Sequence, residues 1–159
     1  MSINVEKHVI QPGHSEYLDD AWDLKERIRE EENVLKQSRR FFRNAYKRAR
    51  DVVFVSGDNN VVGFITARTD GYILFLAVDP DYRQHGLGKR LVASIAENSQ
   101  TVTCHARTTN EAALAFYEEI GFERVRRIDN YYEDGGDAFY LRLGENTNLI
   151  DRLSEYFRR

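Results

Sequence analysis

A glycine-rich turn between a strand and a helix, the segment VDPDYRQHGLGK at 78–89, constrains the fold more than any other feature. The β-rich run YILFLAV at 72–78 ends before Pro80, whose ring nitrogen cannot donate to a strand ladder. Gly86 and Gly88 follow, and apolar residues at helical spacing then continue to about residue 98. Backbone N–H groups and the positive end of a helix dipole converge at such a turn. The segment therefore predicts an anion site, suited to a pyrophosphate.

The spacing within this turn narrows the kind of phosphate site. The sequence has neither the G-x-x-x-x-G-K-[ST] loop of nucleoside triphosphate sites nor the full G-x-G-x-x-G of dinucleotide sites. It has R-x-x-G-x-G instead, and Arg83 and Lys89 add positive charge beside the two glycines. A purely structural turn into a helix is the alternative interpretation of a lone G-x-G.

Helical and strand patterns alternate along the whole chain, without a linker or a repeat. A strand at 3–10 precedes a helix that we expect Ser15 to cap, and a second helix follows around 41–49. The further expected elements are strands at 52–56, 61–69 and 72–78, a helix at about 86–98, a strand at 101–106, a helix at 110–120, and strands at 122–131 and 137–143. This order predicts an α/β (α+β) fold with helices packed on a sheet. We expect one domain at 1–143 and an amphipathic helix at 144–159 packed on it.

The composition excludes several classes of protein. A net charge of -3 over 159 residues lacks the basic surface of a nucleic-acid-binding protein, so we expect no nucleic-acid partner. Cys104 is the only cysteine, which excludes an intramolecular disulfide and a cysteine zinc site, and we expect no metal. The sequence shows neither a signal-peptide core nor a long apolar run, so we expect a cytoplasmic protein that does not enter a membrane.

At the glycine-rich turn the sequence resembles the GNAT superfamily of N-acetyltransferases, whose acyl-CoA signature is [RQ]-x-x-G-x-[GA]. The resemblance implies the GNAT fold, a mixed, mostly antiparallel seven-stranded sheet flanked by about four helices plus a C-terminal helix. It also implies acetyl-CoA as the cosubstrate. The residues implied to line the pantetheine arm are Leu76, Ala77 and Val78, and those implied to bind the pyrophosphate are Arg83, Gln84, His85, Gly86, Leu87, Gly88 and Lys89.

A second motif agrees with the first. The run NEAALAFY at 110–117, followed by Gly121-Phe122, matches the family's N-x-x-A-x-x-F-Y-x-x-x-G-F in order and spacing. Asn110 stands where a side chain would cap a helix, and the resemblance implies that it also touches the cofactor. The resemblance further places the Tyr117 hydroxyl near the CoA sulfur, where it can protonate the departing thiolate. A tyrosine that only packs in the core is the alternative.

Three further features resemble the protein N-terminal acetyltransferases, including the RimI type that is specific for ribosomal-protein alanine. They are HARTTN at 105–110, Tyr72 at the start of the strand before the turn, and NYYEDGGDA at 130–138. The resemblance implies that Tyr131 and Tyr132 close a peptide slot over the substrate's N-terminus. A core role for one of the two is the alternative. It covers roughly residues 50–143.

The chemistry of amine acetylation gives these residues roles. An ammonium cannot attack a thioester, so the acceptor amine must first lose a proton, and histidine is a suitable base. The resemblance assigns His105 as this base and Tyr72 as the residue that orients a water. A hydrogen-bonded core histidine is the alternative for His105. Because neighbours on a strand alternate in direction, we expect Cys104 on the opposite face as a small core residue.

The acceptor is less constrained than the donor. Residues 29–38 contain neither the proline nor the aromatic side chain that the N-terminal acetyltransferases usually carry there. The first hypothesis is acetylation of a protein or peptide N-terminal α-amine. The second is acetylation of a lysine or a small-molecule amine such as a polyamine, attracted by the acidic run 30–32. The third is a non-catalytic CoA-binding regulatory module. We expect a monomer or a homodimer, the latter through the 145–159 segment.

Overall fold

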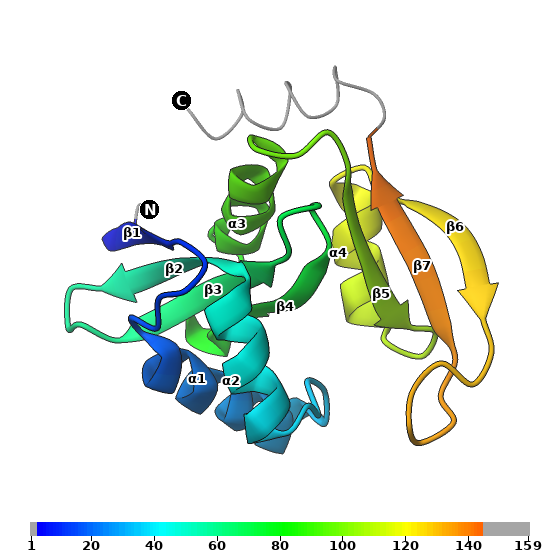
Figure 1. Cartoon of the computed structure of the whole chain (residues 1–159), viewed down its shortest axis with the longest axis horizontal. Coiled ribbons are helices and arrows are strands. Elements are labelled where there is room, and N and C mark those ends of the chain that lie inside the picture. Colours follow the sequence, from blue (N-terminus) through cyan, green and yellow to red (C-terminus); the bar gives the residue numbers. More distant parts are fainter. Residues whose placement is uncertain (1–2, 145–159) are drawn as a thin grey trace. The chain divides into compact units, whose positions relative to one another are not determined.

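The computed structural model describes residues 3–144 (Figure 1). Along the chain the elements are β1 (Val5–Ile10), α1 (Leu18–Glu32), α2 (Arg39–Arg48), β2 (Arg50–Ser56), β3 (Val61–Ala67), β4 (Ile73–Val78), the 3-10 turn Pro80–Tyr82, α3 (Leu87–Ala96), β5 (Val102–Arg107), α4 (Glu111–Glu119), β6 (Glu123–Ile128) and β7 (Ala138–Leu143). Each strand and helix expected within these residues is present, with ends shifted by at most three residues. The expected C-terminal helix falls on 145–159, outside the described residues.

The seven strands are divided between two antiparallel sheets, with the orders β1-β2-β3-β4 and β5-β7-β6. The α/β fold class and the seven strands are therefore confirmed, but the strands do not form a single seven-stranded sheet. An isolated parallel bridge joins Tyr72, the residue before β4, with Thr103 of β5. The described chain accordingly forms two compact units, 3–69 with 73–94 and 70–72 with 95–144. No helix among residues 3–144 is long and apolar enough to cross a membrane.

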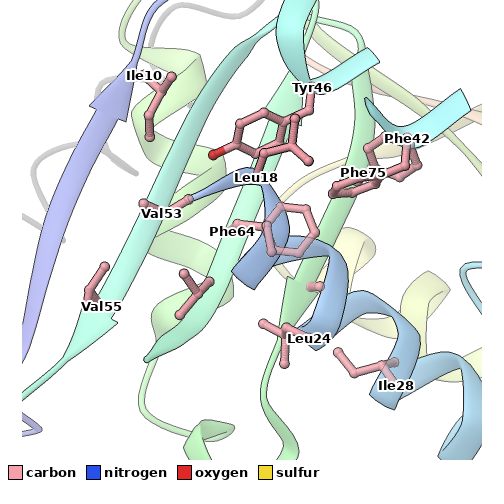
Figure 2. Packing of buried hydrophobic residues seen from close by; sticks show 13 residues of the cluster. Ile10, Leu18, Leu24, Ile28, Phe42, Tyr46, Val53, Val55, Phe64 and Phe75 are labelled. Carbon is pink, nitrogen blue, oxygen red and sulfur yellow. The ribbon is translucent and has the colours of Figure 1, made fainter. Parts of the chain in front are cut away.

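In the first unit, α1 and α2 cover one face of the four-stranded sheet (Figure 2). The apolar side chains that join them include Leu18, Leu24 and Ile28 of α1, Phe42 and Tyr46 of α2, and Val53, Phe64 and Phe75 of the sheet. α3 packs on the opposite face, where the Arg90 guanidinium lies 4.6 Å from the centroid of the Phe54 ring. β2 and β3 are buried along nearly their whole length because both of their faces are covered.

The first helix begins later than expected. Ser15 was predicted to be its N-cap, but the cap residue is Tyr17, with φ 65° and no side-chain hydrogen bond to the helix. The Ser15 carbonyl instead accepts from the backbone N–H of Leu18 at 3.1 Å. This left-handed residue turns the chain so that the Tyr17 ring packs against His8, with ring centroids 5.1 Å apart and the planes tilted by 42°, rather than continuing the helical stripe. The prediction was wrong because ring packing, which a capping pattern does not show, selects the turn.

Asp51 is a carboxylate buried in the first unit. It lies on β2 opposite Thr66, is 0% exposed, and accepts a hydrogen bond from the Thr66 hydroxyl at 2.7 Å. Its Oδ2 atom has no hydrogen-bond partner among the described residues. Burial raises the pKa of Asp51 from 3.8 to about 8, and the Thr66 hydrogen bond opposes this only partly.

Because burial raises the pKa of Asp51, we expect the free energy of unfolding of the protein to fall as the pH rises. Between the unfolded pKa of 3.8 and the folded pKa of about 8 the folded state holds one proton more than the unfolded state, so the free energy of unfolding falls across this window. Asp51→Asn removes the ionisation, and we expect its Tm to exceed that of the wild type at pH 9 by more than at pH 5. Asp58→Asn, in the exposed hairpin turn, is the control. Parallel Tm curves for wild type and Asp51→Asn would contradict the burial argument.

In the second unit, α4 packs on one face of the three-stranded sheet. Asn110 caps this helix as predicted, since its side-chain oxygen accepts from the Ala113 backbone N–H at 3.1 Å. Tyr117 of α4 is buried beside Cys104 of β5. β6 is the exposed edge of the sheet, with five of its six residues open to solvent.

Candidate active site

The predicted phosphate turn lies in the first unit, between β4 and α3. Gln84 and Gly86 both adopt the left-handed conformation, with φ values of 67° and 77°. The Gly86 carbonyl accepts from the backbone N–H of Arg90 at 3.0 Å, so the helix begins directly after this glycine. Amides in the first turn of a helix have no acceptor within the helix. The turn thus directs backbone donors outward from residues that are mostly exposed, while Leu87 anchors it in the core at 1% exposure.

Arg83 has protein partners in the structure. Its Nε donates to the Val78 carbonyl at 3.1 Å, and Nη1 lies 2.9 Å from Glu32 Oε2. A second ion pair, between Arg27 and Asp79 at 2.7 Å, also joins α1 to the segment after β4. Arg83 therefore holds the turn against α1, and one carboxylate of the acidic run at 30–32 is already paired with it.

The three β4 residues predicted to line the cofactor differ in burial. Ala77 is 2% exposed and belongs to the core beneath α1 and α2. Leu76 and Val78 are partly exposed and alternate with it along the strand. The Asp79 backbone N–H continues the ladder by donating to the Val62 carbonyl at 2.8 Å. Lys89 and Gly88 are partly exposed in the first turn of α3, and His85 is exposed in the turn before it.

The second unit brings together Tyr72 and His105, which are 33 residues apart in the sequence. The Tyr72 hydroxyl lies 2.6 Å from His105 Nδ1, in hydrogen-bonding range. His105 is on the face of β5 opposite to Cys104, as alternation predicted, since Cys104 is 2% exposed and His105 is partly exposed. The structure thus brings together the two residues that the resemblance assigned as the base and as the group that orients a water.

Besides Tyr72, two further aromatic rings contact His105. The Tyr131 ring stacks on the imidazole at 4.3 Å with an interplanar angle of 11°, and Tyr140 of β7 lies 5.1 Å away. Tyr132 meets Tyr131 edge to face at 4.9 Å. Arg107 lies 4.0 Å above the Tyr132 ring, and an ion pair of 3.0 Å connects it to Asp134 in the same loop. The loop therefore places the Tyr131 ring on the imidazole, and Tyr132 packs against Tyr131.

The protonation of the cluster follows from burial. Burial, and then the charge of Arg126, lower the pKa of His105 below its ordinary 6.5. Burial, and then a hydrogen bond with Tyr131, raise the pKa of Tyr72 above 10.0. At neutral pH the structure thus holds a neutral imidazole beside a protonated phenol. The tautomer with the proton on Nδ1 donates it to the Tyr72 oxygen and leaves the Nε2 lone pair able to accept a proton.

Gly71 fixes the backbone that carries Tyr72. Its φ is 87°, and a Cβ at this position would overlap the Thr101 carbonyl oxygen. Its own carbonyl accepts from the backbone N–H of Thr103 at 3.0 Å, next to the Tyr72–Thr103 bridge. No other residue type combines this backbone conformation with this close approach.

We expect Gly71→Ala to lower both the Tm and the turnover. The added Cβ forces the backbone away from the Thr101 carbonyl, and this movement carries Tyr72 away from His105. A left-handed non-glycine residue by itself costs about 1–2 kcal/mol. Gly13→Ala is the matched control, since Gly13 has φ 93° but nothing within 4 Å of an added Cβ. Equal losses of Tm in the two variants, measured by calorimetry, would show that the overlap with Thr101 has no effect.

Tyr117 interacts with Cys104, whose position on β5 alternates with that of His105. It is 8% exposed, and burial followed by its interaction with Cys104 raises its pKa well above 10.0. Burial likewise raises the pKa of the Cys104 thiol to about 12, although a hydrogen bond with Tyr117 opposes this. Tyr117 is therefore protonated at neutral pH, and Cys104 is a buried thiol rather than a nucleophile.

Two residues near His105 were not identified from the sequence. Tyr140 and Arg126 share a row with His105 because β5, β7 and β6 pair His105 with Tyr140 and Tyr140 with Arg126. Alternation along a strand was visible in the sequence, but the register between strands was not. Within residues 3–144 no group of three or more His, Cys, Asp or Glu side chains could hold a metal ion.

Known proteins resemble this chain in sequence and in fold. Residues 15–122 match the family described as Acetyltransferase (GNAT) family. The human protein named N-alpha-acetyltransferase 30 is 41% identical over 78 residues, which cover 46% of this chain and 22% of that protein. The Schizosaccharomyces pombe protein of the same name is 33% identical over 107 residues, covering 58% of this chain and 71% of that protein.

A solved structure resembles nearly the whole chain. A chain in the crystal structure of the NatC complex bound to Gag peptide and CoA is 27% identical, with a TM-score of 0.67 over 89% of this chain and 98% of that one. Several sequence relatives are longer proteins, of which this chain spans only a part, as the 22% coverage of the human protein shows. The family match spans well over half of the 159 residues, and the chain therefore belongs to the GNAT acetyltransferase family.

Proposed function

We propose that this chain is an acetyl-CoA-dependent N-acetyltransferase whose acceptor is the N-terminal α-amine of a protein or peptide. The observation that carries the proposal is the 2.6 Å contact between the Tyr72 hydroxyl and His105 Nδ1, in a member of the GNAT family. The names of the relatives support the choice of acceptor, because both the human and the Schizosaccharomyces pombe protein are named N-alpha-acetyltransferase 30. The NatC structure, solved with a peptide and CoA, agrees with it.

The turn and strand of the first unit fit the donor. Gly86 with its positive φ, the outward first-turn amides of α3 and the cation of Lys89 suit a pyrophosphate. Leu76, Ala77 and Val78 are the residues that would follow the pantetheine arm, with Asn110 of the second unit as a further contact. Arg83 supports the turn through Val78 and Glu32. Bound acetyl-CoA supplies the thioester whose acetyl group is transferred.

The second unit supplies the proton transfers. His105, neutral because its pKa is lowered, accepts the proton of the acceptor ammonium, and Tyr72 holds the imidazole and a water in place. The amine nitrogen then bonds to the acetyl carbonyl carbon as the carbon–sulfur bond breaks. The protonated Tyr117 is the group assigned to give a proton to the sulfur, and the second proton that the nitrogen loses as the amide forms balances the proton that Tyr117 gives up. Tyr131 and Tyr132 form a wall for the substrate's N-terminus. Both units are proposed to act as one acetyltransferase domain at 1–143.

An acceptor panel tests the proposal. The full chain with acetyl-CoA is offered peptides with free N-termini, N-terminally blocked lysine peptides, and polyamines, and acetylation is followed by mass spectrometry. We expect acetylation at the α-amine of the unblocked peptides. Acetylation restricted to lysine side chains or polyamines would replace this acceptor with the second hypothesis. CoA binding without any turnover would identify a non-catalytic CoA-binding module.

A further inference from the structure

Arg126 lies on the same face of the three-stranded sheet as His105, and its guanidinium charge has no role in the function proposed above. Among residues 3–144 no carboxylate forms an ion pair with its guanidinium. Its neighbours on β6 differ: Arg124 pairs with Glu118, and Arg127 pairs with Asp129 and Asp137. Arg126 is exposed and thus able to meet a ligand.

Three strands place Arg126 in line with the candidate base. Tyr140 of β7 is the register partner of His105 on one side and of Arg126 on the other. Residues directly opposite in an antiparallel pair share a face, so all three side chains project to the same side. The Arg126 guanidinium lies 5.7 Å from the Tyr140 ring centroid, and Tyr140 lies 5.1 Å from the imidazole.

The other arginines near His105 differ from Arg126, because each already has a carboxylate beside it. Arg107 is held by Asp134 and the Tyr132 ring. Arg142 shares the face, but its register partner is Glu123, so a carboxylate already stands opposite it. A β-bulge after Arg124 turns Arg126 rather than Val125 toward Tyr140. The bulge therefore places in the row of His105 an arginine that has no carboxylate partner within the described part of the chain.

We propose that Arg126 binds an acidic side chain at one of positions two to four of the acceptor peptide. This rests on the proposed N-terminal acetyltransferase function. Two strand spacings separate the backbones of His105 and Arg126 by about 10 Å, which is the span of about three extended residues. A peptide whose α-amine lies at His105 and whose chain runs along this row thus brings its early side chains to the guanidinium. A carboxylate there neutralises a guanidinium charge that has no carboxylate partner among residues 3–144.

The test compares peptides that are identical except for Glu, Gln or Lys at position two, three or four. For the wild-type chain we expect one position at which the Glu peptide has a kcat/KM about fivefold above that of the Gln peptide, the gain that an exposed ion pair allows. The difference should appear as a lower KM for the Glu peptide. It should shrink in high salt, which screens the ion pair. Arg126→Gln should remove the advantage, and Arg126→Glu should shift it to the Lys peptide. Arg124→Gln, on the opposite face of the same strand, is the matched control and should keep it.

The outcomes separate this inference from the function on which it rests. Equal rates for Glu, Gln and Lys peptides at every position, with α-amine acetylation intact, would overturn the role of Arg126 alone. A Glu preference that survives in Arg126→Glu would do the same. Failure of every peptide, while CoA still binds, would overturn the proposed function and the role of Arg126 with it.

Discussion

Replacing His105 by alanine is expected to lower turnover by about 10²-fold or more, which is the lower end of what a positioned general base contributes. The substitution removes the imidazole that lies 2.6 Å from the Tyr72 hydroxyl and that can accept a proton near neutral pH. It leaves the β5 backbone and its pairing with β7 in place, because the side chain is only partly buried. The loss should therefore appear in kcat rather than in the affinity for CoA.

The pH–rate profile distinguishes a catalytic role of His105 from a purely structural one. A base acts when deprotonated, so the wild-type rate should fall as the pH decreases through the pKa of His105. Burial and Arg126 lower that pKa, which places the acidic limb of the profile below pH 6.5. In His105→Ala this limb should disappear. His14→Ala, which removes an exposed histidine of the first unit, is the control and should keep it. An unchanged profile in His105→Ala would remove His105 from the role of base.

Gly86→Glu is expected to weaken CoA binding by about 10²-fold or more, equivalent to about 2.7 kcal/mol. Two effects combine at this position. Gly86 has φ 77°, so a side chain strains the turn that begins α3. The added carboxylate would also stand where helix-terminal amides and Lys89 favour an anion, and would repel the pyrophosphate. Titration calorimetry with CoA measures the loss directly.

Two further variants separate these effects. Gly86→Asn tolerates the left-handed conformation better than most residues and adds bulk without charge, so we expect an intermediate loss of affinity. Gly57→Glu places the same carboxylate in the β2–β3 turn, where nothing lies within 4 Å of an added Cβ, and should bind CoA as the wild type does. Retained CoA affinity in Gly86→Glu, with an unchanged Tm, would show that the turn is only structural.

Local patterns identified most elements because their causes are local. The hairpin at 57–60 forms where the sequence predicted it, with Asn59 at φ 63° in the turn. Asn110 caps α4 because a short polar side chain can reach the first-turn amides whatever surrounds the helix. Ser15 failed as a cap because Tyr17 packs on His8, which belongs to the preceding strand β1 and which a capping pattern does not include.

The sequence alone determined the family, the phosphate turn and the residue types that amine acetylation needs, because these reside in short motifs with fixed spacing. Only the tertiary structure decided which side chains meet. Strand pairing placed Tyr140 and Arg126 in the row of His105, and the bridge at Tyr72 brought its hydroxyl to the imidazole. The tertiary structure also places Arg83 against Glu32 and buries Asp51. Register and burial depend on contacts between residues far apart in the chain, so no local pattern can specify them.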